Sequence, residues 1–380
     1  MISLRRFVVS ILPGPLHSIL QPWWRRFFRF KRRVREWCES WIAFIIWVVW
    51  LVFQCARHRK RAVIICRLVG IGDVVCTLPM CDDVRRRHPG KLLVFITSAV
   101  CREVVILSRS ADLVYANRSW VYPFTMPAKV KLFGLVDTIY NPQTAGERVY
   151  KGGMTRHLIE DLAGSCGFTV TARQPKLYPS LGLIEKTRLA YGLHCKTTGQ
   201  RLLIGINPGP NWRVKEWDAS KWQRLINKIH SEYDAVIIQF GTNKGDGSSE
   251  YDNLTGVKSL ASRLGGAEIV ALIASCALMI SIDSGPAHVA GAVDTPVIGL
   301  FGPLNPILIL PPDSPALGLC SDVPCLFCFN RTPVINWLSG CPNDIACMEK
   351  LDDQTVFEAV KSMLARGKKR EVKELLTVFD

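Results

Sequence analysis

Residues 278–293 read LMISIDSGPAHVAGAV, an apolar run, a short polar turn and a second run rich in small residues. The first run, Leu278–Ile282, predicts a buried strand, and Gly285–Val293 predicts a helix. Asp283 or Ser284 can cap that helix, and the free N–H groups of its first turn can hold phosphate oxygens. The stretch therefore predicts an α/β fold in which a polar loop follows a strand and opens a helix.

The same order of elements occurs in two series along the chain. The first has a strand at Ala62–Cys66, a glycine turn at Leu68–Gly72, a helix at Asp73–Arg87 and a strand at Lys91–Thr97. The second has a strand at Leu202–Ile206, a loop at 207–218, a helix at Ala219–Ser231 and a strand at Ala235–Phe240. Residues 171–182, with two prolines and a glycine, favour a connection between two domains. We expect two doubly wound domains that bind ligands at the carboxyl ends of their strands.

A glycine-containing motif, Gly70–Val74, follows the first predicted strand and opens the first predicted helix. Glycine permits the tight turn that such a junction requires. A dinucleotide-binding fingerprint continues with a third glycine, but position 75 is Val. Asp73 is the distinctive residue, and it is either a first-turn carboxylate that interacts with the helix dipole or a catalytic group.

A second loop, Asn207–Trp217, carries two cations, Arg213 and Lys215, close together. Such a pair suits a diphosphate, although a solvated loop with packed tryptophans would show the same pattern. His288, alone, would more often be a packed core histidine. The recurrence of three polar loops at equivalent strand ends favours a functional role for all three.

The basic charge of the chain is concentrated at its N-terminus. The net charge is +16, and residues 1–61 hold 13 of the 48 Lys and Arg but two of the 32 Asp and Glu. Tryptophan and phenylalanine alternate with these cations at 23–30, a mixture that favours an anionic membrane surface over nucleic acid or a disordered tail. No nucleic-acid partner is expected.

An apolar run at 41–53 lies within this basic segment. As a helix it spans about 20 Å, short of the roughly 30 Å hydrocarbon core, and extending it to Trp37–Ala56 would bury Glu39. Basic residues flank both ends, so the sequence favours a helix in the plane of the interface and leaves a spanning helix open. No cleavage site for a secretory signal follows.

The chain has 14 cysteines and no secretory signal, which indicates a reducing compartment and buried thiols. Cys325 and Cys328 have the spacing of a metal or redox pair, but no second pair completes a zinc site. We therefore expect no metal and keep Cys320, Cys325, Cys328 and Cys341 as the alternative ligand set.

Together, the three loops resemble the heptosyltransferase family of bacterial lipopolysaccharide biosynthesis, glycosyltransferase family nine. The resemblance covers roughly residues 62–363. It rests on Gly70–Val74, on Asn207–Trp217 with its Lys-x-Trp ending, on Asp283–His288 and on Leu300-Phe301-Gly302-Pro303.

The resemblance implies a GT-B fold and an inverting transfer, without metal or cofactor, from a nucleotide sugar, typically ADP-heptose, to a lipid-linked inner-core glycan. By analogy Asp73 is the general base on the acceptor hydroxyl, and Lys215 neutralises the departing diphosphate. The residues implied in donor binding are Gly72, Asn207, Gly209, Pro210, Asn211, Arg213, Glu250, Asp283, Ser284, Gly285 and His288.

The expected organisation has four parts: a membrane-associated segment at 1–61, an acceptor domain at 62–182, a nucleotide-sugar domain at 183–366 and a charged tail at 367–380. The enzyme is expected at the cytoplasmic face of the bacterial inner membrane. Two departures leave the sugar open: the loop reads Asp-Ser-Gly-Pro-Ala-His where dedicated heptosyltransferases commonly show Asp-Thr-Gly-Leu-x-His, and Pro210 stands where small or hydroxyl residues are usual. Transfer of another sugar, or a non-catalytic nucleotide-sugar-binding scaffold, are the alternatives.

Overall fold

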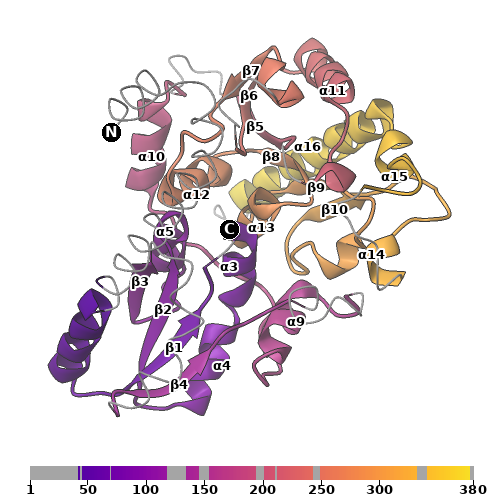
Figure 1. Cartoon of the computed structure of the whole chain (residues 1–380). Helices are drawn as coiled ribbons and strands as arrows, with labels where there is room; N and C mark the ends of the chain where they lie inside the picture. Colours follow the sequence, from indigo (N-terminus) through magenta and orange to yellow (C-terminus); the bar gives the residue numbers. More distant parts are fainter. Residues whose placement is uncertain are drawn as a thin grey trace, which may run out of the picture. The chain divides into compact units, whose positions relative to one another are not determined.

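The computed structural model of the chain describes residues 42, 45–68, 70–117, 134–144, 154–193, 201–209, 212–242, 249–331 and 340–376. Contacts divide the chain into two units, one of residues 1–61 and 119–136 and the other of residues 62–118 and 137–380. The described strands of both sheets belong to the second unit, apart from Val136 at the start of the first sheet's last strand (Figure 1). The domain boundary expected at residue 182 stays a prediction.

In the first unit, residues 45–58 form a helix that is apolar on two sides. Trp47, Leu51 and Cys55, spaced four residues apart, are buried, and the Cys55 thiol donates to the carbonyl of Leu135 at 3.9 Å. The opposite face is exposed and consists of Ile42, Ile45, Ile46, Val49, Val52 and Phe53. None of the described helices has the length and apolarity needed to cross a bilayer.

The first sheet of the second unit has the strand order β3-β2-β1-β4. Its strands are β1 (Ala62–Cys66), β2 (Leu92–Ser98), β3 (Leu113–Asn117) and β4 (Val136–Tyr140). β1 pairs with β2, and β2 with β3, in parallel register. All five side chains of β1 are buried, as expected for a parallel strand covered on both faces.

The helix predicted at Asp73–Arg87 is two helices, α3 (Ile71–Thr77) and α4 (Met80–Arg87). The prediction of one helix was wrong because Pro79, which lacks an N–H and restricts the residue before it, interrupts the hydrogen-bond ladder. The next helix, α5 (Ala99–Ser108), leads to β3 and completes the covering of the sheet.

The second sheet is larger and has the order β10-β9-β8-β5-β6-β7. Its strands are β5 (Leu202–Asn207), β6 (Ala235–Gln239), β7 (Val257–Ser259), β8 (Leu278–Ile282), β9 (Val297–Leu300) and β10 (Ala316–Leu319). Every pair is parallel. The chain order reverses at β5, which lies between β6 and β8, so the carboxyl ends of β5 and β8 form the usual ligand-binding edge of such a sheet.

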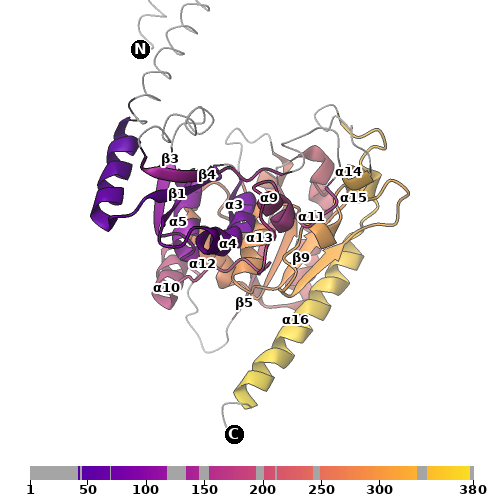
Figure 2. The same ribbon diagram turned by 90° about the horizontal axis from the view of Figure 1, so that it is seen from below.

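Two layers of helices cover this sheet. On one face, Ile204 and Ile206 of β5 belong to a cluster with α11 (Ala219–Glu232) and α16 (Asp353–Leu376), which contact each other. Figure 2 shows α16 as the long yellow helix that leads to the C-terminus. On the other face, α12 (Gly266–Ala274) and α13 (Gly285–Ala292) share a hydrophobic cluster with α3 and α5. One continuous core therefore connects the helices that follow the two sheets.

The remaining elements are short helices in the segments that connect the strands and longer helices. They are α9 (Leu158–Gly164), α10 (Leu181–Ala190), η2 (Arg213–Lys215), η3 (Glu250–Asn253), η4 (Pro306–Leu308), α14 (Cys328–Arg331) and α15 (Ala346–Glu349). Segment 174–177, inside the predicted connection, is fixed to the end of α13: Leu177 donates its N–H to Ala292 O at 2.8 Å, and Lys176 Nζ pairs with Asp294 Oδ1 at 2.8 Å.

Candidate active site

Asp73 lies in the first turn of α3 and is held by groups from two sides. Its Oδ2 is 2.9 Å from Nη2 of Arg67, the residue that follows β1. Gly70, the N-cap of α3, has a φ of +72°, and a Cβ there would lie 2.6 Å from Asp73 Oδ2. Glycine is therefore required at 70 for its backbone conformation and for the space that the carboxylate occupies.

Lys215 and Asp283 form an ion pair at the carboxyl end of the second sheet. Lys215 Nζ, from η2, is 2.7 Å from Asp283 Oδ2, which follows β8, and both side chains are at least 85% buried. The same ammonium lies 4.8 Å from the ring centroid of Trp212, which is half exposed. A cation is thus fixed at the carboxyl end of the second sheet.

Asn207, the last residue of β5, organises the adjoining loops. Its Nδ2 donates to Ser281 Oγ at 3.3 Å and also to Ser284 Oγ. Gly241, with a φ of +115°, lies against it, since a Cβ there would be 2.7 Å from Asn207 Oδ1 and 3.1 Å from Gly209 O. Ser284 is the extended N-cap of α13, so this network fixes the start of the helix whose N–H groups face the loop.

α3, which carries Asp73, and α13, which carries His288, pack against each other (Figure 1). A glycine from each helix, Gly72 and Gly285, lies at the contact. A Cβ on Gly285 would lie 2.2 Å from Ile71 Cγ2 and 3.1 Å from the backbone N of Gly72. A Cβ on Gly72 would lie 2.7 Å from His288 Cδ2 and 3.0 Å from Gly285 Cα. The two glycines therefore act as spacers that bring Asp73 toward the Lys215–Asp283 pair.

His288 is buried at this contact. Its Nδ1 is 3.3 Å from the thiol sulfur of Cys76 on α3. Burial raises the pKa of Cys76 well above its ordinary value, and the negative charges of Asp73 and then Asp283 raise it further. Both carboxylates therefore lie near the same thiol. The binding of phosphate or sugar by His288 stays a prediction, and in this structure the imidazole is 5% exposed.

The burial of His288 also makes the stability of the protein depend on pH. Burial lowers the pKa of His288 from 6.5 to about 4; Asp283 opposes this shift, while His157 and Lys215 add to it. The unfolded chain binds a proton below about pH 6.5 and the folded chain does not until about pH 4. Stability is therefore present above pH 6.5 and is lost as the pH falls toward 4.

Because the unfolded chain binds a proton at His288 and the folded chain does not, we expect the free energy of unfolding to fall by about 2 kcal/mol when the pH is lowered from 7.5 to 5. Denaturant unfolding of the protein and of His288→Gln at both pH values measures it. The drop on acidification should be about 2 kcal/mol smaller in the variant, since all other titrating groups, including the buried His157, are common to both. Equal drops would show that His288 is not held neutral by the fold.

Two predicted donor-binding residues lie at the edge of this arrangement. Arg213 is exposed, with its Nη1 3.9 Å from Glu216 Oε2. Glu250 is exposed in η3, which is fixed to the loop because Tyr251 donates its hydroxyl to Trp217 O at 2.9 Å. Pro210 and Asn211 lie outside the described residues. The structure thus brings Asp73, Lys215, Asp283 and their neighbours together; the individual roles stay predictions.

The cysteines of residues 320–347 form no metal centre in the described part of the chain, where no group of three or more His, Cys, Asp or Glu is arranged to hold an ion. They are nevertheless neighbours: burial, and then the nearby thiols of Cys328, Cys325 and Cys341, together raise the pKa of Cys347 to about 11. Cys347 also packs against Gly302, where a Cβ would be 2.5 Å from its sulfur. The expectation that these cysteines bind no metal stays a prediction.

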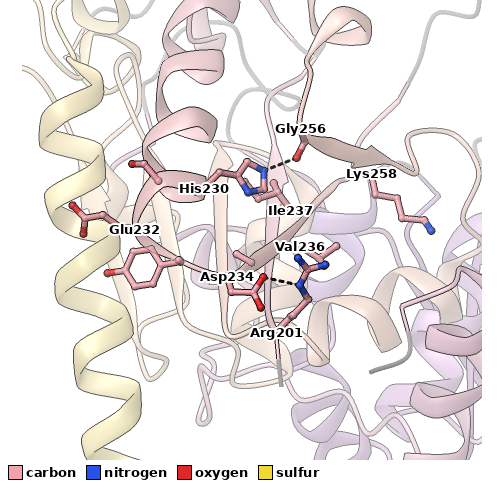
Figure 3. A pocket seen from close by; sticks show the side chains of 11 residues that line it. Arg201, His230, Glu232, Asp234, Val236, Ile237, Gly256 and Lys258 are labelled. Carbon is pink, nitrogen blue, oxygen red and sulfur yellow. Dashed lines mark hydrogen bonds and ion pairs between the residues drawn. The ribbon is translucent and has the colours of Figure 1, made fainter. Parts of the chain in front are cut away.

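A pocket of about 590 Å³ lies at the opposite end of the second sheet (Figure 3). It is lined at the amino ends of β5 and β6, where Arg201 Nε pairs with Asp234 Oδ1 at 2.6 Å and His230 Nε2 is 2.7 Å from Gly256 O. The predicted site residues follow the carboxyl ends of the strands. This pocket is therefore separate from the candidate active site.

Sequence reasoning missed three residues that the structure adds to the site: Arg67, Cys76 and Trp212. A signal existed for the first, because an arginine directly after a wholly apolar strand is buried at a cost unless it is paired. Cys76 follows from how α3 packs against α13, which no local pattern reveals. Trp212 lies in the predicted loop Asn207–Trp217, in which only the cations had a predicted role.

Two Rossmann-like sheets, with a carboxylate at the edge of one and a lysine–aspartate pair at the edge of the other, define a GT-B fold, as solved structures confirm. A glycosyl transferase family 9 structure from Veillonella parvula superposes with a TM-score of 0.61 at 16% identity, covering 80% of this chain and 97% of that one. The E. coli ADP-heptose LPS heptosyltransferase II superposes with a TM-score of 0.57 at 16% identity, covering 81% and 100%.

Residues 161–337 match the family model for glycosyltransferase family 9 (heptosyltransferase). The chain is 34% identical over 118 residues to lipopolysaccharide heptosyltransferase 3 of Escherichia coli, an alignment that covers 30% of this chain and 34% of that protein. Over these residues the chain is therefore similar to the heptosyltransferase family. It spans about a third to a half of the length of the curated relatives it matches.

Proposed function

We propose that the protein is an inverting glycosyltransferase that moves heptose from ADP-heptose onto a lipopolysaccharide-core-type glycolipid. The observation that supports it is the contact between α3, which carries Asp73, and α13, which begins directly after the loop that holds Asp283. Asp283 in turn holds a cation, because its Oδ2 lies 2.7 Å from Nζ of Lys215. Lipopolysaccharide heptosyltransferases among the relatives, and the ADP-heptose named for one structural neighbour, support the choice of donor.

In the proposed reaction the acceptor hydroxyl oxygen forms a bond to the anomeric carbon of the donor sugar. The bond between that carbon and the phosphate oxygen breaks, and the electron pair leaves with ADP. The hydroxyl proton passes to the carboxylate of Asp73, which is partly exposed and pairs with Arg67. Lys215 neutralises charge that develops on the diphosphate, and the N-terminus of α13 supplies backbone donors.

Purified full-length protein is offered ADP-heptose, with UDP- and GDP-sugars in parallel, and deep-rough lipopolysaccharide as acceptor. We expect release of ADP together with a mass increase of one heptose on the acceptor. Transfer from another donor alone would retain the mechanism but contradict the sugar. Donor binding without turnover would instead show a nucleotide-sugar-binding scaffold.

We further propose that the exposed apolar face of helix 45–58 lies on the anionic cytoplasmic surface of the bacterial inner membrane, where a lipid-linked acceptor is available. Val49, 63% exposed, and Phe53 belong to this face, and the basic run Arg57–Arg61 follows it. Both features favour an anionic interface. Sedimentation with phosphatidylglycerol but not phosphatidylcholine vesicles, lost in Val49→Asp/Phe53→Asp, is the expected result; equal recovery with both lipids would contradict it.

A further inference from the structure

Arg67 contacts the carboxylate of Asp73, and nothing above gives it a part in the reaction. It directly follows β1, and its backbone N–H donates to Ile96 O at 3.0 Å, which extends the pairing of β1 with β2. Its side chain is 6% exposed. A buried guanidinium is retained at a cost in desolvation, so its contacts are expected to serve a purpose.

The guanidinium of Arg67 joins two loops at the carboxyl edge of the first sheet. Nη1 donates to the carbonyl of Pro142, which follows β4, at 3.0 Å. Nη2 lies 2.9 Å from Oδ2 of Asp73. Because the first contact fixes the plane of the guanidinium against the backbone, the second holds the carboxylate in one orientation.

The same carboxylate oxygen is restricted on its other side. Gly70 lies against Asp73 Oδ2, where an added Cβ would be 2.6 Å away. Oδ2 is therefore enclosed between Gly70 and Arg67, while the Asp73 side chain as a whole is 31% exposed. The carboxylate of Asp73 is therefore restricted on two sides and remains partly accessible.

We infer that Arg67 is the positioning residue of the general base: by holding Oδ2 of Asp73 it orients the carboxylate that receives the proton of the acceptor hydroxyl, and its positive charge favours the ionised form of that carboxylate. The inference rests on the proposed function, because it assigns Arg67 to the reaction in which Asp73 is the base. Arg67 does not touch the reacting atoms and acts only through Asp73.

The other charged or titratable groups near Asp73 do not replace Arg67. Cys76 on α3 and Cys101 on α5 are both affected by the Asp73 charge, and burial raises the pKa of each thiol, so both are neutral. Asp283, the other carboxylate that acts on Cys76, pairs with Lys215. A nearby cation favours the ionised form of a carboxyl group, and a nearby anion disfavours it. The positive charge of Arg67 therefore favours the form of Asp73 that can accept a proton.

The test compares Arg67→Met and Arg67→Lys with Arg85→Met in the full-length protein. Arg85 pairs with Asp112 at 2.8 Å on the surface of the first sheet and provides a matched loss of an arginine ion pair. We expect Arg67→Met to lower kcat about 10- to 100-fold with little change in KM for ADP-heptose. The acidic limb of its pH–activity profile should shift about one unit or more toward higher pH. Arg67→Lys should restore the limb and part of kcat, and Arg85→Met should match the unchanged protein.

A second measurement does not depend on turnover. Carbon-13 NMR of aspartate carboxyl groups, with the Asp73 signal assigned from Asp73→Asn, follows the titration of Asp73 in each variant. A higher midpoint in Arg67→Met, returned toward normal in Arg67→Lys, supports the inference even if ADP-heptose proves not to be the donor. An unchanged midpoint, or a loss of activity in Arg67→Met with an unchanged profile and no rescue by lysine, overturns it.

Discussion

Replacement of Asp73 by Asn is expected to reduce kcat for heptose transfer about 10³-fold while leaving donor affinity within a few-fold of normal. Positioned general bases typically contribute between 10² and 10⁴ to rate, and an amide of the same shape cannot accept the proton. The amide oxygen can still accept the contact from Arg67 at 2.9 Å, so the local structure should persist. Stopped assays of acceptor glycosylation give kcat, and calorimetric titration with ADP-heptose gives affinity.

Asp137→Asn is the matched control for this variant. Asp137 has nearly the same exposure as Asp73, 28% against 31%, and also forms an ion pair, with Lys91 Nζ at 3.7 Å, but it lies within β4, away from the loops of the site. It should retain full activity. Near-normal turnover in Asp73→Asn would remove Asp73 from the role of base. A parallel loss of donor affinity would indicate damage to the α3–α13 contact instead of loss of a proton acceptor.

The parts of the fold that were predictable from sequence are those with strong local signals. β1 and β8 have the predicted bounds because each is a short, wholly buried apolar run followed by a polar or glycine-containing turn. The edge strands β3 and β10 were missed: the side chains of β10 are only half buried, so its apolar pattern is weak. Pro79 was a visible helix breaker that the prediction of one long helix disregarded.

The candidate site was predictable as a set of loops but not as a set of contacts. Asp73, Lys215 and Asp283 each follow a strand or begin a helix, and parallel strands bring such residues to the same edge of a sheet. The pairing of Lys215 with Asp283, of Cys76 with His288 and of Gly72 with Gly285 joins residues at least 68 positions apart. The first contact depends on which strands are neighbours in the second sheet, and the other two depend on how helices from different sheets pack; periodicity and turn chemistry encode neither.

Addition of one methyl group at Gly285 is expected to have the second large effect. In Gly285→Ala the new Cβ would lie 2.2 Å from Ile71 Cγ2 and 3.1 Å from the backbone N of Gly72. The Ile71 side chain can rotate away, but the backbone of α3 cannot yield without moving the helix that carries Asp73. We expect overpacking to cost about 1–3 kcal/mol of the free energy of unfolding. We also expect kcat/KM to fall about 10²-fold, since displacements near 1 Å in a catalytic arrangement have effects of that size.

Gly182→Ala separates this steric effect from the general effect of replacing a helical glycine. Gly182 also lies in the first turn of a helix, α10, and a Cβ there meets nothing within 4 Å, so this variant should be as stable and active as the unchanged protein or slightly more stable.

Ile71→Ala combined with Gly285→Ala removes the closest clash and leaves the contact with Gly72, so it should recover part of both losses. If Gly285→Ala alone were fully stable and active, α3 and α13 would not need their close approach for catalysis, and Asp73 would act from a separated position. Recovery in the double variant would instead show that the spacing of these two helices, set by two glycines, determines how near the base lies to the Lys215–Asp283 pair.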